Sequence, residues 1–261
     1  MNTKFKFLVN EEEWSASQIE RLEYERNLHI LHQMKEHGIE IKDGDKVLSD
    51  DDIDMLTADE AWKVSIAART VNDGVTILEH YKESFERSDE MWKKLGFSQD
   101  KPMKVSYANM YVDGMSVQEY MGIMKLMQED EGMLISAHPE HFHTVVEGND
   151  LVGIEPFGAY GTPTLCNVKF GSVDECGAQI RADKKDDFPV AVCGRTFLRD
   201  GVTEVNTPFH QLKPTANGFE AIMAVYWPEG VPDEIVSGHS LHLIMEFYRG
   251  LKIIEDMRDK K

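Results

Sequence analysis

The chain has 261 residues, of which 41% are hydrophobic, and this is enough apolar material for one sizeable core. Its 47 acidic residues outweigh 28 basic ones, and the net charge of −19 argues against nucleic acid as a partner, because phosphate binding needs clustered Lys and Arg. The sequence shows neither an apolar run of membrane-spanning length nor a signal-peptide pattern. We therefore expect a cytoplasmic protein without a membrane partner, folded as a single domain over residues 1–261.

Residues 1–98 are predicted to form an N-terminal helical region. Apolar residues recur at helical spacing over residues 14–34 and again over residues 57–78, with Gly74 as a break in the second stretch. The apolar faces of such helices can pack over a sheet, cover a cavity or form a homodimer. This part of the chain gives no indication of chemistry.

Residues 99–261 are predicted to form a sheet followed by a long helix. Residues 103–112 alternate like a strand, and a capping-box pattern then predicts a short helix over about residues 117–127. From residue 134 to residue 227, short apolar runs are separated by Gly, Pro, Asn and Asp, which is typical of a meander of antiparallel strands.

Residues 233–257 are predicted to be a long C-terminal helix, because two acidic residues suit its first turn and apolar residues follow at helical spacing. The order of elements indicates an α+β fold in which this helix lies across a curved antiparallel sheet. The helix would then bury one stripe of its surface against the sheet.

That stripe carries polar side chains, namely His239, His242 and Glu246, among apolar neighbours. A buried carboxylate without a partner is costly, so it requires a cation, a hydrogen-bond network or protonation. Two interpretations remain open. His242 and Glu246 could bond to each other four residues apart, or they could both be ligands of a divalent metal.

Further metal ligands could come from two other segments. Residues 138–143 contain three histidines, namely His138, His141 and His143. Glu155 is the only charge in the apolar run 151–158, where a lone carboxylate also requires a partner.

These motifs together resemble the phloretin hydrolase and diacetylphloroglucinol hydrolase family, which cleaves a carbon–carbon bond between an acyl group and a phenolic ring. The resemblance rests on the capped helix after a strand, the histidine run 138–141, the strand ending at Glu155, and the His-x-x-x-Glu of His242 and Glu246. It spans roughly residues 103–255. The resemblance implies a helix-grip fold, a curved antiparallel sheet around a long C-terminal helix.

The resemblance also implies a zinc ion held by two histidines and two glutamates, of which Glu155, His242 and Glu246 match three. At the place of the fourth ligand the chain has the residues 125–128, Lys-Leu-Met-Gln, without a histidine. We expect His239 or His143 to supply the missing nitrogen, since zinc takes about four donors. Iron or manganese would accept the same donor types.

The implied function is therefore a metal-dependent hydrolase of small aromatic or phenolic ketones. The metal would polarise the ketone or activate a water, and a nearby acid would protonate the ring that leaves. The candidates for this proton transfer are His143, His210 and Tyr160.

Two other functions remain open. His141, His143 and Glu147 have the HxH-x3-E form of a cupin metal motif, which would suit a dioxygenase or an isomerase. The protein could also be a non-catalytic helix-grip protein whose methionine-lined cavity binds a small molecule, with the His and Glu residues as a buried polar network. The three cysteines lack metal-site spacing and are expected to be buried small residues.

Overall fold

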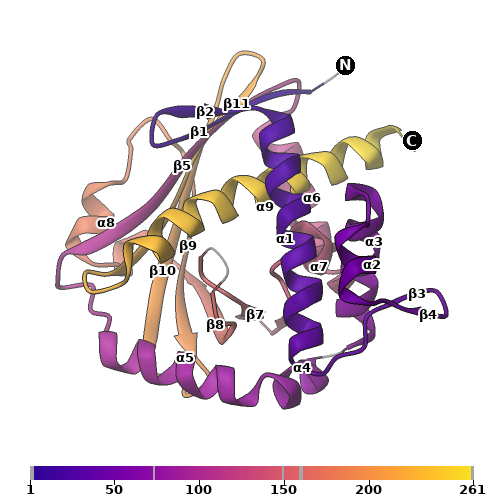
Figure 1. The fold of residues 1–261 in the computed structure, drawn as a ribbon. Helices are drawn as coiled ribbons and strands as arrows, with labels where there is room; N and C mark the ends of the chain where they lie inside the picture. Colours follow the sequence, from indigo (N-terminus) through magenta and orange to yellow (C-terminus); the bar gives the residue numbers. More distant parts are fainter. Residues whose placement is uncertain (1–2, 73, 149, 159–160, 260–261) are drawn as a thin grey trace.

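The computed structural model describes residues 3–72, 74–148, 150–158 and 161–259. Its N-terminal part begins with two short strands and continues mainly as helices, with one small separate hairpin (Figure 1). These elements are β1 (Lys4–Val9), β2 (Glu12–Trp14), α1 (Ala16–Glu36), β3 (Lys42–Asp43), β4 (Lys46–Val47), α2 (Asp50–Asp54), α3 (Ala58–Val71), α4 (Gly74–His80) and α5 (Lys82–Leu95). The predicted helices are present, and the predicted break lies where α4 begins.

The helix α1 begins with a full capping box, in which the Ser15 side chain accepts from the Gln18 N–H and the Gln18 side chain accepts from the Ser15 N–H. Its buried face contains Ile19, Ile30 and Leu31, as expected from the helical spacing of its apolar residues.

The remaining elements form most of the sheet and the C-terminal helix. They are β5 (Met103–Asp113), α6 (Val117–Gln128), α7 (Glu131–Ala137), β6 (His143–Glu147), β7 (Asp150–Glu155), β8 (Thr164–Gly171), η1 (Val173–Glu175), α8 (Ala178–Ala182), β9 (Val190–Leu198), β10 (Glu204–Pro214), β11 (Gly218–Pro228) and α9 (Asp233–Asp259).

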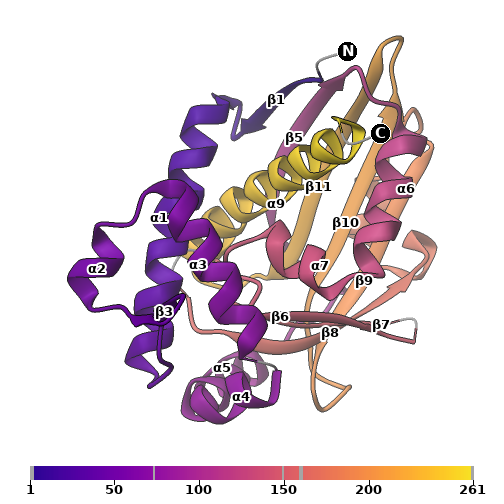
Figure 2. The same cartoon turned by 90° about the vertical axis from the view of Figure 1, so that its right-hand side faces the viewer.

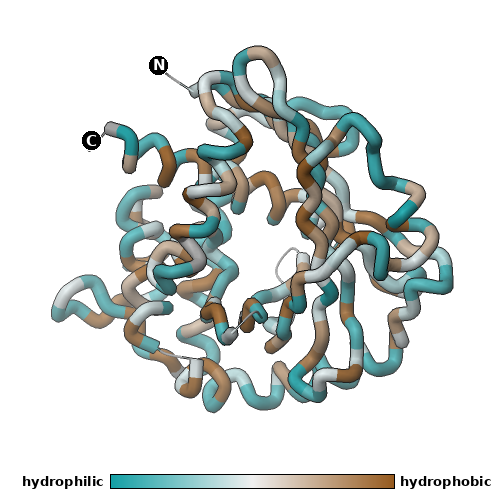
Figure 3. Tube along the Cα trace, turned by 180° about the vertical axis from the view of Figure 1, so that it is seen from behind, coloured by the Kyte–Doolittle hydropathy of each residue, from teal (hydrophilic) through white to brown (hydrophobic). Residues whose placement is uncertain are grey.

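In the described part of the chain, nine strands form one antiparallel sheet in the order β2-β1-β5-β11-β10-β9-β8-β7-β6. The predicted α+β class is confirmed at this level: the sheet packs against the long helix α9 and the N-terminal helices (Figure 2). Hydrophobic residues gather along the strands, and the outer loops are largely hydrophilic (Figure 3). No described helix has both the length and the apolar character needed to cross a membrane.

Two expectations for local structure were wrong. The N-terminus contains two strands that were not predicted: β1 pairs with β5, and β2 pairs with β1 at the end of the sheet. Residues 131–137 form the helix α7, which overlaps the start of the stretch predicted as strands, because the Asp130 side chain accepts from the Met133 N–H and caps a helix there.

The first half of α9 is attached to β5 by side-chain hydrogen bonds. Ser106 Oγ donates to the Val236 carbonyl oxygen at 2.7 Å, and Ser240 Oγ accepts from the Tyr107 N–H at 3.0 Å. The Trp227 indole N–H donates to Ser106 Oγ at 2.8 Å. These bonds fix the turns of α9 that carry the predicted site residues over the sheet.

Candidate metal centre

The loop between α7 and β6 carries His138 and His141, and its backbone is held by a buried arginine. Arg69 from α3 is 2% exposed. Its Nη1 atom donates to the carbonyl oxygens of Ile135, His138 and His141, each at 2.8 Å. A charged donor shared by three carbonyls fixes the path of this loop, because buried carbonyl oxygens require partners.

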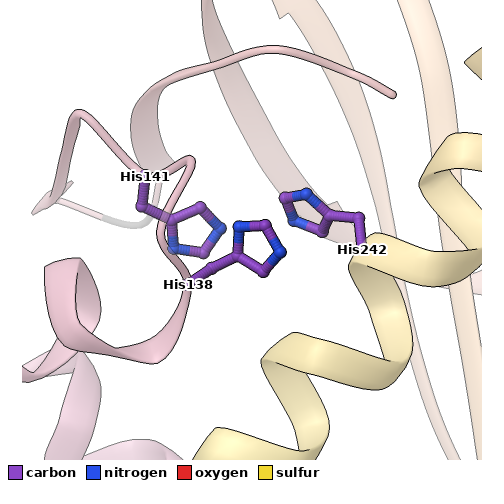
Figure 4. A group of neighbouring side chains, drawn as sticks. All are labelled: His138, His141 and His242. Atoms are coloured by element: carbon purple, nitrogen blue, oxygen red, sulfur yellow. The ribbon is translucent and has the colours of Figure 1, made fainter. Parts of the chain in front are cut away.

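Three buried histidines meet where this loop faces α9 (Figure 4). One nitrogen from each of His138, His141 and His242 lies within 4.8 Å of the others, so the group could bind a metal ion. The His138 ring stacks on the His242 ring with a centroid separation of 3.6 Å. Neutral imidazoles are common ligands of transition metals.

Two carboxylates border the same group. Glu155, at the end of β7, places Oε2 at 3.1 Å from His141 Nε2 and at 3.5 Å from His242 Nε2. Glu246, one turn after His242 on α9, places Oε2 at 4.0 Å from His242 Nε2. Two ring nitrogens and two carboxylate oxygens therefore converge from a loop, a strand and a helix.

The hydrogen bonds of the outer ring nitrogens determine which nitrogens carry protons. His141 Nδ1 lies 3.2 Å from the Leu134 carbonyl oxygen, which can only accept, so this nitrogen donates. His242 Nδ1 lies 3.3 Å from Glu140 Oε2 and donates to it. His138 differs, because its Nδ1 accepts from the Glu140 N–H at 3.0 Å. In the neutral forms, His141 and His242 thus present bare Nε2 atoms, whereas His138 carries its proton on Nε2.

The electrostatics of the group favour ionised Glu155. Burial alone would raise the pKa of this carboxyl, but the hydrogen bond with His141 and the charges of His141, His242 and His239 lower it to about 2. Burial lowers the pKa of His141, yet the bond to Glu155 outweighs it and raises the pKa. The pKa values of His138 and His239 are held well below the ordinary value. Burial is the main cause, and the charge of His242 is the second.

A cavity of about 210 Å³ opens over these groups. His141, Glu155, His242 and Glu246 line its polar part, and His239 lines it as well. Most of the remaining wall is apolar and comes from the strands β7 to β11, the loop after β7, and the helices α6, α7 and α9. It includes Met124, Leu134, Phe157, Val168, Val225 and Phe247. Such a site, apolar with a few convergent polar groups, is typical of small-molecule binding.

His210 on β10 also lines this cavity. Burial lowers the pKa of its imidazole to about 4, so the ring is neutral near pH 7. Its Nδ1 accepts from the Ala224 N–H at 3.3 Å, which leaves the ring proton on Nε2. The ring also lies edge-on to Phe247, with centroids 5.4 Å apart.

A scan against models of protein families finds no match, and a search of curated proteins finds no relative. Among solved structures, the chain is similar to the crystal structure of protein Ms6760 from Mycobacterium smegmatis, at 11% identity and a TM-score of 0.33, covering 60% of this chain and 96% of that one. No family is assigned by these comparisons.

The predicted metal ligands Glu155, His242 and Glu246 are brought together. His239 lies beside them, stacked on His242 at a centroid distance of 4.8 Å, and its Nδ1 has no hydrogen-bond partner among the described residues. His141, rather than His239, brings its Nε2 atom to Glu155, at 3.1 Å from Oε2.

The predicted proton donors are distributed differently. His210 lines the cavity, as expected of a residue that meets a ligand. His143 places Nδ1 at 3.1 Å from Glu131 Oε1 and lies against Gly74 of α4, outside the group of His138, His141 and His242. Tyr160 lies outside the described residues.

Three charged residues that contact the histidines or their loop were not predicted from the sequence, namely Arg26, Arg69 and Glu140. Each is at most 2% exposed. A signal existed for Arg26, since it follows Ile19 by seven residues and precedes Ile30 by four, on the apolar face of α1. A charge on such a face requires a buried partner.

Proposed function

We propose that the chain is a metal-dependent hydrolase that cleaves the carbon–carbon bond between an acyl group and a phenolic ring. The observation that carries the proposal is the set of four donor atoms from His141, Glu155, His242 and Glu246. Three separations among them are 3.1 Å (His141 to Glu155), 3.5 Å (His242 to Glu155) and 4.0 Å (His242 to Glu246). A tetrahedral zinc ion with bonds of about 2.0–2.1 Å separates its donors by about 3.3–3.4 Å, and these three separations lie near that value.

The proton positions support the same four ligands. His141 and His242 donate from Nδ1 to an oxygen and leave Nε2 free, which is the usual arrangement of zinc-binding histidines. His138 is less suited, because its Nδ1 already accepts a backbone N–H and its Nε2 then carries the proton. In this proposal His141 takes the place of the histidine that the hydrolase family has at the end of the capped helix.

The sheet and the long α9 suit the helix-grip arrangement of that family. A metal bound to this donor set would polarise a substrate carbonyl or lower the pKa of a bound water. The donors suit zinc first, and iron or manganese accept the same types. In the net reaction, the hydroxyl of water adds to the acyl carbon. The bond between the acyl carbon and the ring breaks, its electron pair stays on the ring carbon, and the ring carbon takes a proton.

The other cavity residues would bind and orient the substrate. The apolar walls would hold an aromatic ring and exclude bulk water from it. His210 presents a neutral Nε2–H to the cavity, suited to donate a hydrogen bond to a phenolic or ketone oxygen. His210 acts in this proposal as a hydrogen-bond donor near pH 7, because its low pKa leaves the ring neutral there.

The first test is the metal content of the protein, purified without a histidine tag and measured by plasma mass spectrometry. We expect nearly one zinc ion per chain, lost in Glu155→Ala and His242→Ala. The matched control is His143→Ala, which removes a nearby imidazole that pairs with Glu131 instead. The second test follows release of a carboxylic acid and a phenol from acyl phenols. Metal-free wild type, or full activity in Glu155→Ala, would contradict the proposal.

A second candidate is a small-molecule-binding protein without catalysis. It is favoured by the fact that the polar groups already satisfy one another, as in the ion pair of His141 and Glu155 at 3.1 Å. In that case the wild type binds acyl phenols in the cavity, contains no metal and releases no product. The cupin alternative has less support, since Glu147 is exposed at the end of β6 while His141 is buried.

A further inference from the structure

Behind the proposed ligands lies a buried ion pair that joins the N-terminal helices to α9. Arg26 of α1 and Glu140 of the histidine loop have side chains that are each 1% exposed, and Arg26 Nη1 lies 2.7 Å from Glu140 Oε1. The other carboxylate oxygen, Oε2, accepts from His242 Nδ1 at 3.3 Å. One carboxylate therefore bridges a cation from α1 and an imidazole from α9.

A buried ion pair alone is weak evidence for stability, because removing two charges from water offsets most of their attraction. The geometry here gives the pair a more specific consequence. The Glu140 oxygen is a strong acceptor only for a protonated Nδ1, so it selects the His242 tautomer with a bare Nε2. That Nε2 is the atom nearest to Glu155 and Glu246.

The N-terminal region supports the same carboxylate from a second side. Arg69 of α3 binds the carbonyl oxygens on either side of Glu140 in sequence, those of His138 and His141. The Glu140 N–H in turn donates to His138 Nδ1. The backbone of Glu140 is thereby held by groups independent of its own side chain, and the carboxylate is directed at His242.

We propose that Glu140, held by Arg26, is a positioning residue for the metal centre and that the N-terminal helices serve to place it. It would set the ring orientation and the proton of His242 before any metal binds. The expected effect on metal affinity rests on the proposed metal site. The position of the His242 proton does not depend on a bound metal. Partners of this kind typically change metal affinity or activity by about 10- to 100-fold.

The test compares two buried glutamates, each of which pairs with an arginine and links α1 to another element. Glu140→Gln removes the charge that faces His242. The control Glu23→Gln removes the charge of another buried residue, which pairs with Arg249 and so also connects α1 with α9. A merely structural role for Glu140 would make the two variants behave alike.

Zinc affinity is measured by competition with a chelator, and cobalt(II) absorption reports the geometry of the site. We expect zinc binding to weaken by about 10- to 100-fold in Glu140→Gln and to remain unchanged in Glu23→Gln. The cobalt spectrum should shift only in Glu140→Gln. Wild-type affinity in Glu140→Gln, or equal losses in both variants, would overturn the inference.

A separate measurement distinguishes failure of this inference from failure of the proposed function. Nitrogen-15 spectra of the histidine rings in metal-free wild type are expected to show the His242 proton on Nδ1. A neutral ring with its proton on Nε2 would overturn the positioning role even if zinc binds. Wild type that binds no zinc but carries the proton on Nδ1 would refute the metal site and leave the orientation of His242 by Glu140 supported.

Discussion

The half-buried imidazole of His210 makes the stability of the protein sensitive to acid. Its pKa is about 4 in the folded chain because of burial, against 6.5 for the ordinary group. Between these values the unfolded chain binds more protons than the folded one, so stability falls as the pH falls from 6.5 towards 4. The difference of about 2.5 pKa units corresponds to about 3 kcal/mol of unfolding free energy. This stability is fully lost only when the pH lies below the pKa of the folded state.

The variant His210→Asn removes this titration and keeps an acceptor, because the Asn Oδ1 atom can take the place of Nδ1 opposite the Ala224 N–H. Urea unfolding of both proteins at about pH 7 and about pH 4.5 measures the free energy of unfolding. Other groups titrate in both proteins and cancel in the comparison. We expect the wild type to lose about 2.5 kcal/mol more than the variant between these two conditions. Equal losses of unfolding free energy in the two proteins would refute the conclusion that the folded chain keeps the His210 ring neutral.

Three further predictions concern the framework around the site. Arg69→Met should lower the unfolding free energy by about 3 kcal/mol or more and speed amide exchange in the loop of His141, because three buried carbonyls lose their donor. Gly218→Ala should cost about 2 kcal/mol or more in urea unfolding, since its Cβ would lie 1.8 Å from the Val112 carbonyl oxygen. The three cysteines should resist alkylation by iodoacetamide until urea unfolds the chain, because they are buried and burial raises the pKa of Cys166 well above its usual value. Unchanged loop exchange, unchanged stability or rapid alkylation would contradict each in turn.

Much of the fold follows from periodicity in the sequence. The strand predicted over residues 103–112 and the helix predicted over residues 233–257 agree closely with β5 and α9, because each has a long and regular apolar pattern. The short strand β1 was missed because it pairs with β5, about a hundred residues away, and β2 was missed because it pairs only with β1. No local pattern reveals such a partner.

For the candidate site as well, some residues could be predicted from local sequence patterns and others could not. His242 and Glu246 were found because they interrupt the apolar stripe of one helix, and Glu155 because it is the only charge in the apolar run 151–158. The pairing of Arg26 with Glu140 joins residues 114 positions apart, so each side chain alone gives no indication of the other. The choice of His141 among the neighbouring histidines likewise depends on which ring faces Glu155 in three dimensions.

The attachment of α9 to β5 has a consequence for how copies of the chain can associate. In the described structure, β1 pairs with residues 109–113 of β5 only, so the earlier half of β5 would otherwise present an open edge. There the Ser240 hydroxyl accepts the Tyr107 N–H, and α9 covers the position where a strand of another molecule would add. The opposite end of the sheet is β6, with Val146 exposed. Strand-to-strand assembly of two copies is therefore left to the terminal strands β2 and β6, and the part of β5 that α9 covers is closed to it.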